Sequence, residues 1–279
     1  MESLERTRRV IAGQPVDRLP AQPVLMMFAA QNAGYRYLDY TVDGGKMAHA
    51  QLKMMEDYGV DCLLTCSDPA REVIDIAGTG SVDWFDDQGP AINEGRAALR
   101  DKARLKQFKL PDPLGGGRMH DRIKGIEIMR REGGPGVSIV GWVEGPLALG
   151  AELRGVCTIM TDFLDDPPFV RDLFAFTSEV AIHYAMAQIE AGADTIGMSD
   201  AAASMMGPRP YAEFLFPMQQ RVFTVIKEKY PEVTARRHLR AGFSGGFAAG
   251  AGQTRAGTGD LRECLHHYGL AGRHAGKGL

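Results

Sequence analysis

The chain has 279 residues, 44% of them apolar, and a formal net charge of −3. This size and apolar content suit a globular protein with one large domain or two small ones, and the weak acidic charge argues against a dedicated nucleic-acid binder, which normally presents a basic face. No stretch of about 18 apolar residues occurs, so we expect no membrane partner. The N-terminal residues mix acids and bases without an apolar segment, so they do not resemble a signal peptide, and four cysteines are too few for a disulfide framework. A cytoplasmic location fits these features best.

The expected elements alternate between strand and helix. Strands are predicted where short, nearly all-apolar runs occur, and helices where apolar residues recur every three or four positions. In chain order the prediction is a helix at 1–13, a strand at 17–27, a helix at 46–58, a strand at 61–66, a loop-rich segment at 80–118, a helix at 119–132, and then strand 137–143, helix 168–191, strand 194–198, helix 210–229 and strand 233–238. The first helix is expected to turn Leu4, Val10 and Ile11 inward. All-apolar strands that alternate with helices are typical of a buried parallel sheet.

Polar side chains follow the predicted strands where each strand ends. These residues are Asp68, Glu144, Asp200 and His238. In parallel barrels of strands and helices, the carboxyl ends of the strands line the active site, so all four are candidate site residues. An aspartate in such a place also often caps a helix or turns the chain, so both roles stay open for Asp68 and Asp200.

Three segments resemble the uroporphyrinogen decarboxylase superfamily: VDRLPAQPV, GWVEGPLALGAELRG and AGADTIGMSDAAASMMGPRPYAEFLFPMQQRV. The resemblance covers about 5–238 and implies an α/β fold of the TIM (β/α)8 type, of which this chain would supply about five of the eight strands. The superfamily includes the decarboxylase of haem synthesis. It also includes zinc-dependent methyltransferases that work with corrinoid proteins.

The decarboxylase branch is matched only in part. Its arginine-rich turn after the first strand corresponds to MMFAAQNAGYRYLDY, which keeps Arg36 but lacks the first arginine. Ala151 and Ala201 stand where the decarboxylases carry a tyrosine and a serine. The porphyrinogen substrate bears eight carboxylates, so losing these partners disfavours its binding. Asp68 does match the aspartate beneath the pyrrole N–H groups, so uroporphyrinogen III decarboxylase stays as the alternative function.

The methyltransferase branch carries a His-x-Cys motif at the end of the fifth strand, which binds zinc together with a later cysteine. His238 is in place as a metal ligand, but Arg240 occupies the position of the cysteine, and a cationic side chain cannot ligate zinc. The resemblance implies that zinc in the intact relative activates a thiol or similar acceptor, and that a methylcorrinoid on a partner protein supplies the methyl group. Asp68, Glu144 and Asp200 would then be the catalytic residues at the barrel mouth.

Four more residues are expected to bind substrate. Met26 and Met27 follow the first predicted strand and would line a pocket for a flat apolar ligand. Arg36 would hold a substrate carboxylate, although a surface salt bridge is an equal alternative. Trp142, near the end of the strand at 137–143, would contact the substrate as well.

The composition changes near the end of the chain. From 235 to 279 there is no Val, Ile, Met, Trp or Pro, although barrel strands need β-branched residues to fill the interior. We therefore predict a partial barrel domain at 1–238, followed by an aberrant or disordered tail at 239–279. Codons for the residues after His238 can be chosen so that another reading frame gives Ile-Cys-Gly, which suggests a frameshift. A truncated, non-catalytic product is the third interpretation.

Overall fold

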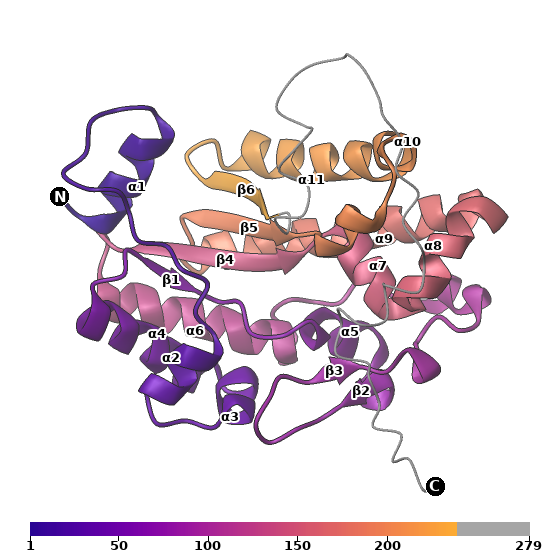
Figure 1. Cartoon of the computed structure of the whole chain (residues 1–279), viewed down its shortest axis with the longest axis horizontal. Helices are drawn as coiled ribbons and strands as arrows, with labels where there is room; N and C mark the ends of the chain where they lie inside the picture. The colour runs from indigo at the N-terminus through magenta and orange to yellow at the C-terminus, as the bar shows by residue number, and fades with distance from the viewer. Residues whose placement is uncertain (239–279) are drawn as a thin grey trace, which may run out of the picture. The chain divides into compact units, whose positions relative to one another are not determined.

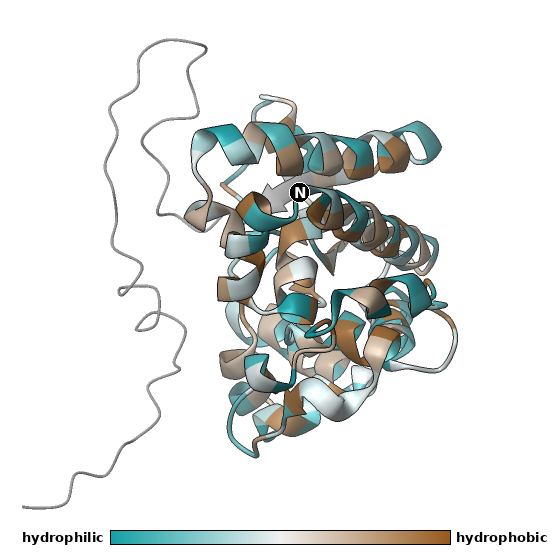
Figure 2. Cartoon of the chain, turned by 90° about the vertical axis from the view of Figure 1, so that its right-hand side faces the viewer, coloured by the Kyte–Doolittle hydropathy of each residue, from teal (hydrophilic) through white to brown (hydrophobic). Residues whose placement is uncertain are grey.

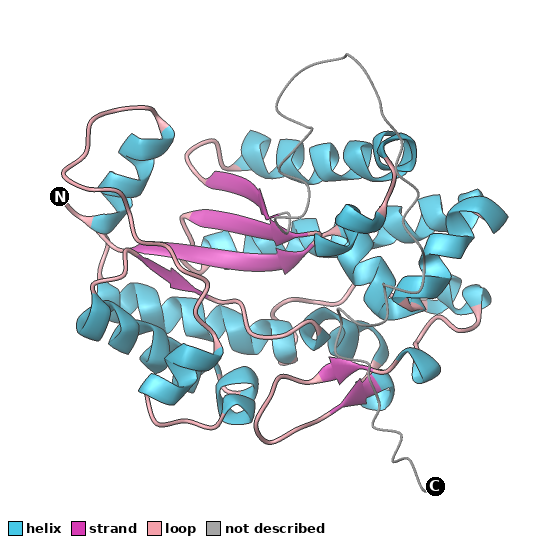
Figure 3. Ribbon diagram, viewed as in Figure 1, coloured by secondary structure: helices cyan, strands magenta, loops and turns pink. Residues whose placement is uncertain are grey.

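A parallel sheet of four strands, in the order β1-β4-β5-β6, forms the centre of the computed structural model, which describes residues 1–238 (Figure 1). Its strands are β1 (Cys62–Leu64), β4 (Ser138–Glu144), β5 (Thr195–Ser199) and β6 (Thr234–His238). A separate two-stranded antiparallel ribbon joins β2 (Val82–Asp83) to β3 (Ala91–Ile92) (Figure 3). The predicted tail at 239–279 lies outside the described residues.

Helices precede and follow the strands, as the alternating pattern predicts. They are α1 (Ser3–Ile11), α2 (Met27–Asn32), α3 (Tyr37–Val42), α4 (Gly44–Tyr58), α5 (Ala70–Ala77), α6 (Arg118–Gly133), α7 (Pro146–Arg154), α8 (Val156–Asp165), α9 (Pro167–Glu190), α10 (Pro208–Pro210) and α11 (Phe216–Lys229). Short 3-10 turns are η1 (Thr79–Ser81), η2 (Glu94–Arg96), η3 (Lys102–Gln107) and η4 (Ala201–Met205), and η5 (Tyr211–Leu215) is one turn of π-helix. Figure 2 shows apolar residues on the inner sides of many of these helices. Within residues 1–238, no helix has both the length and the apolar character that crossing a membrane requires.

The two faces of the sheet have different surroundings. All seven residues of β4 are buried, and the side chains of a strand point alternately to opposite faces. Ile139 and Val143 belong to the main core with the helices, whereas Val140 and Trp142 form a separate apolar cluster with residues of β1. Glu144 follows this second set by the same alternation. We call the face that carries Val140, Trp142 and Glu144 the inner face.

A glycine makes room for the largest side chain of the inner face. Gly197 of β5 is the register partner of Trp142. A Cβ atom at position 197 would lie 2.7 Å from Cε3 of the Trp142 ring. Because real Cβ atoms do not approach other atoms so closely, the indole can cover β5 only where the side chain of its neighbour is absent.

One arginine holds the connections that enter β4 and β5. Arg130, in the last turn of α6, donates to the carbonyl oxygens of Gly134 and Val137, at 2.8 Å each, just before β4. The same guanidinium donates to the carbonyl of Gly192 and, at 3.1 Å, to the Asp194 carboxylate, both just before β5. Two successive turns at the amino edge of the sheet are thereby joined through one side chain.

The predicted strand at 17–27 is wrong. The residues before α2 form no strand, and the described sheet therefore has four parallel strands where the sequence suggested five. Pro20 and Pro23 lack the N–H group that a sheet ladder needs, which accounts for the difference. Asp61 still holds the segment beside β1: Ala21 donates to the Asp61 carboxylate at 2.7 Å and accepts from its backbone N–H at 2.8 Å.

The inward face of the first helix also differs from the prediction. Arg6 and Thr7 are buried, whereas Ile11 is 61% exposed. Arg6 donates to Asp61 at 2.5 Å and to Asp17 at 2.7 Å. The buried guanidinium is tolerated because carboxylates on two other segments pair with it, and a pattern based on apolar residues alone could not reveal this.

Candidate active site

The four predicted strand-end residues lie at one edge of the sheet. Glu144 ends β4 and pairs in register with Ser199, which in turn pairs with the backbone of His238 at the end of β6. Asp68 follows β1 and Asp200 follows β5. Asp68, Glu144 and Asp200 are buried, with 6%, 8% and 0% of their surfaces exposed. The structure thus brings together the three carboxylates that the sequence marked as catalytic.

Asp68 is both a helix-capping residue and half of an ion pair. Its Oδ1 accepts from the backbone N–H of Ala70 at 3.0 Å, at the start of α5. Its Oδ2 accepts from the Ser67 hydroxyl at 2.7 Å and from Arg118 Nη2 at 2.8 Å. The Arg118 guanidinium also lies 5.8 Å from the centre of the Trp84 ring. The capping role that the sequence left open is therefore present, and the carboxylate charge is balanced by Arg118.

Glu144 belongs to a buried group of carboxylates around Arg71. Arg71, in the first turn of α5, is fully buried, and its Nη2 lies 3.3 Å from Oε1 of both Glu144 and Glu72. Its Nη1 donates to the Asp68 carbonyl oxygen at 2.5 Å. Glu72 Oε1 also accepts from the backbone N–H of Glu144 at 3.2 Å. Glu152 of α7 lies near enough for the charges of Glu144, Glu72 and Arg71 to affect its ionisation.

The ionisation of these carboxyls is strongly shifted. Burial raises the pKa of Glu144 to about 8, and the charges of Glu72 and Asp200 act in the same direction against the opposing charge of Arg71. Burial, followed by the charges of Glu144 and Glu72, also raises the pKa of Glu152 well above its usual value. A carboxyl group with a pKa near neutrality can both give and take a proton in a reaction.

Asp200 is held by backbone and amide donors. Its Oδ1 accepts from the N–H of Ala148, in the first turn of α7, at 2.8 Å, and its Oδ2 accepts from Gln219 of α11 at 2.6 Å. A Cβ atom at Gly145 would lie 2.5 Å from Cγ of Asp200, so the carboxylate occupies the space beside this glycine. These contacts fix the start of α7 against β5, and Asp200 adds negative charge next to Glu144.

The predicted substrate-binding residues are not brought together. The side chain of Arg36 is 61% exposed and pairs with Asp39 at 3.0 Å and Asp86 at 3.3 Å, which is the surface alternative considered from the sequence. Met27 is 45% exposed on α2, and Met26 is half-buried against the main core. Trp142 alone lies on the inner face with Glu144.

The described residues do not form the zinc site that the resemblance implies. Among the side chains of residues 1–235, no three of His, Cys, Asp or Glu converge on a point that could hold a metal ion, and the side chain of His238, the implied ligand, lies outside this set. Burial raises the pKa of the Cys66 thiol, near the end of β1, to about 12. Arg240, which occupies the cysteine position, lies outside the described residues.

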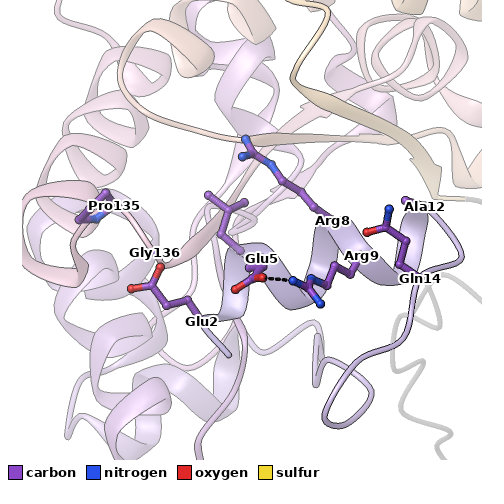
Figure 4. Close-up of a pocket in the computed structure, with 9 residues that line it drawn as sticks. Glu2, Glu5, Arg8, Arg9, Ala12, Gln14, Pro135 and Gly136 are labelled. Carbon is purple, nitrogen blue, oxygen red and sulfur yellow. Dashed lines mark ion pairs between the residues drawn. The ribbon is translucent and has the colours of Figure 1, made fainter.

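A hollow at the opposite edge of the sheet involves none of these groups. It has a volume of about 540 Å³ and lies between α1 and the turn before β4, with Arg8, Arg9 and Gln14 on one side and Gly136 on the other (Figure 4). Arg9 is already paired with Glu5 at 2.6 Å. We place the candidate active site at the carboxyl edge, where the buried ionisable groups gather.

Several members of the site were missed in the sequence because they lie on helices and not at strand ends. Arg71 and Glu72 lie in the first turn of α5, Glu152 lies in α7, and Arg118 is the first residue of α6. The available signal was a charged pair in the first turn of a helix that directly follows a strand-end aspartate. Such a pair faces the same edge as the aspartate itself.

The comparisons with known proteins agree with this fold. The sequence profile of the uroporphyrinogen decarboxylase family matches residues 2–255. A methyltransferase structure from Methanosarcina mazei matches with a TM-score of 0.73 at 22% identity, over 86% of this chain and 69% of the other. At that identity the likeness concerns the fold.

The sequence relatives fall into two activities. Uroporphyrinogen decarboxylase from Nostoc sp. is 29% identical over 57% of this chain, which spans 46% of the length of that enzyme. Methylcobamide:CoM methyltransferase MtbA from Methanosarcina mazei is 25% identical over 88% of this chain and 71% of its own length. The protein is thus a member of the uroporphyrinogen decarboxylase family, with an α/β fold of that family's type and relatives in both its decarboxylase and its methyltransferase branches.

Proposed function

We propose that this protein is of the methyltransferase type within its family and moves a methyl group between a corrinoid carried by a partner protein and a small acceptor such as a thiol. The observation that carries this proposal is the charge at the carboxyl edge of the sheet. Asp68, Glu144 and Asp200 are acidic, and both Arg71 and Arg118 are already bound to carboxylates of the protein.

This charge distribution is unfavourable for a porphyrinogen with eight carboxylates. Such a substrate needs guanidinium or hydroxyl groups directed at its acid groups, and unpaired like charges in a buried site are costly. Arg36, the remaining arginine of the decarboxylase-like turn, points to Asp39 and Asp86. A methyl acceptor with a neutral or weakly acidic group does not meet this repulsion.

The residues of this chain would act as follows. The apolar inner face around Trp142 would exclude water from the transferred methyl group, and Glu144 would exchange a proton with the acceptor. Arg71 would hold Glu144 in place. The described side chains form no site for zinc, and none of these roles depends on one.

Two assays of the full chain test the proposal. We would incubate it with methylcobalamin and coenzyme M and follow loss of the methyl–corrinoid absorbance, and in parallel with uroporphyrinogen III and follow decarboxylation. Methyl transfer above the no-protein rate, without decarboxylation, is expected. Decarboxylation would favour the alternative enzyme instead. If the chain showed neither activity, this result would support the interpretation that the polypeptide is a non-catalytic product.

A further inference from the structure

The group of carboxyls around Arg71 contains more acid than base. Glu72 and Glu144 share one guanidinium, Glu152 lies near enough for these charges to act on it, and the nearby Asp68 is matched by Arg118. If all three glutamates were ionised, this buried group would carry an excess of negative charge. Keeping two uncompensated carboxylates out of water costs more than binding a proton, so the group is expected to retain protons at neutral pH.

Several buried polar atoms in the same group have no hydrogen-bond partner among the described residues. These are Arg71 Nε, Glu72 Oε2, Glu152 Oε2 and the hydroxyl of Tyr184, a fully buried residue of α9. Tyr184 lies near the group, because the charges of Arg71 and Glu72 act on its ionisation. Unmatched donors and acceptors at one place provide positions for a mobile proton or a small polar ligand.

We infer that Arg71, Glu72, Glu144, Glu152 and Tyr184 form a proton-holding site, in which Glu144 is the member that exchanges a proton with a molecule bound at the carboxyl edge. Glu144 is suited to this role because it ends β4 at that edge, and its side chain keeps 9% exposure, compared with 1% for Glu72 and 0% for Arg71. Arg71 and Glu72 are positioning residues in this arrangement.

Among the described residues, the ionisable groups that interact electrostatically with Glu144 come from several elements. They are Arg71 and Glu72 of α5, Cys66 before α5, Glu152 of α7 and Asp200 after β5. Among these, Arg71 is the cation closest to the Glu144 carboxylate, and it is shared with Glu72. The excess of acid therefore remains after every one of these neighbours is included.

The proton-holding site itself does not depend on the proposed methyl transfer. Only the use of Glu144 as the proton acceptor in a reaction rests on that proposed function. In the fraction of molecules in which Glu144 is ionised, a fraction that grows as the pH approaches about 8, an acceptor thiol would lose its S–H proton to a Glu144 oxygen. The sulfur lone pair would form the new S–C bond. The bond between the methyl carbon and its donor would break, with the electron pair staying on the corrinoid. The proton would then pass to solvent, which restores the carboxylate.

Infrared spectroscopy of the full chain tests whether the proton is there. At pH 7 the wild type should show the C=O absorption of a protonated carboxyl group, which should fade as the pH rises through about 8. Glu144→Gln or Glu152→Gln should remove at least half of this band, and Tyr184→Phe should shift it. Glu56→Gln, an exposed glutamate of α4, is the matched control and should leave it unchanged. A wild type without the band at pH 7 would overturn the inference.

The methyl-transfer assay separates this inference from the proposed function. Glu144→Gln should lower kcat at least tenfold, with little change in KM, and should remove the limb of the pH profile near 8. Turnover of the wild type with no infrared band would leave methyl transfer in place and reject the proton-holding site. The band without turnover would retain the site and reject methyl transfer. An unchanged pH profile in Glu144→Gln would reject the role of Glu144.

Discussion

The two edges of the central sheet differ in how the charge of some of their buried acids is balanced. At the amino edge, Asp61 accepts from Arg6 and Arg18, and Asp194 accepts from Arg130 at 3.1 Å and from the backbone N–H of Ile139 at 2.6 Å. At the carboxyl edge, Glu144 shares one arginine with Glu72.

The pKa shifts follow this difference. Burial acts to raise the pKa of Asp61, but hydrogen bonds from Arg18 and Ala21 lower it overall. Burial raises the pKa of Glu144, and one shared arginine does not reverse it. Asp61 at the amino edge thus stabilises the fold in its charged form, whereas burial of Glu144 at the carboxyl edge favours its protonated form.

Removing an acid from the amino edge should have the largest effect on stability. Asp61→Ala would leave Arg6, with 7% side-chain exposure, without its shortest carboxylate contact and would release residue 21 from β1. We expect a loss of about 3–5 kcal/mol in the free energy of unfolding, typical for breaking a buried ion pair. Urea denaturation at pH 7 measures it.

The exposed Asp87 provides a control for this variant, because Asp87→Ala removes the same chemical group from the surface. It should change stability by less than about 0.5 kcal/mol. An equal effect of the two substitutions would show that the amino edge is not held together by its ion pairs.

At the carboxyl edge, the contribution of Glu144 to stability should depend on pH in the direction opposite to that of Asp61. The folded pKa of Glu144, about 8, lies above its ordinary value of 4.5, so the folded state binds the proton more tightly. The contribution of this group is fully present below about pH 4.5 and is lost as the pH rises through about 8. Glu144→Gln should remove this decline, on the order of a few kcal/mol.

Denaturation at intervals from pH 5 to 9 would reveal the difference between Glu144→Gln and the wild type. Asp61 changes stability in the other direction, because its lowered pKa makes its contribution disappear as the pH falls. Identical pH curves for wild type and Glu144→Gln would mean that Glu144 is ordinarily ionised and the two edges do not differ.

Gly197, in the middle of β5, provides a reference substitution whose effect on stability depends on packing and not on charge. Gly197→Ala would place a methyl group 2.7 Å from the Trp142 ring. We expect a loss of about 1–3 kcal/mol that does not vary with pH, because the indole must move. Thermal unfolding followed by tryptophan fluorescence would report it, with Gly80→Ala as control, since position 80 has open space.

The smallest effect is expected outside both edges. Arg36→Ala removes two exposed ion pairs, which should cost less than about 1 kcal/mol. The KM for the acceptor should also stay within about twofold, because Arg36 points to Asp39 and Asp86. A tenfold rise in KM, with stability unchanged, would instead support the substrate-binding role that the sequence suggested.

The sequence indicated the carboxyl edge but not what balances its charge. Strand ends can be located from apolar runs, so Asp68, Glu144 and Asp200 could be found without a structure. Glu152 could not, because its position near the group depends on how α7 packs over the sheet, and the charged pair at the start of α5 did not show that Arg71 would contact Glu144. The apolar run at 17–27 was misleading for a related reason, since apolar content does not show that Pro20 and Pro23 lack the donors a strand requires.

The Arg130 guanidinium has a consequence for how the protein opens. Because one side chain bonds both the turn into β4 and the turn into β5, neither strand can leave the sheet without breaking hydrogen bonds that also hold the other. We expect amide hydrogens of the two strands to exchange with solvent as one cooperative unit, whereas in Arg130→Met they would exchange independently. A single long side chain would thus decide whether two neighbouring strand–helix units behave as one body or as two.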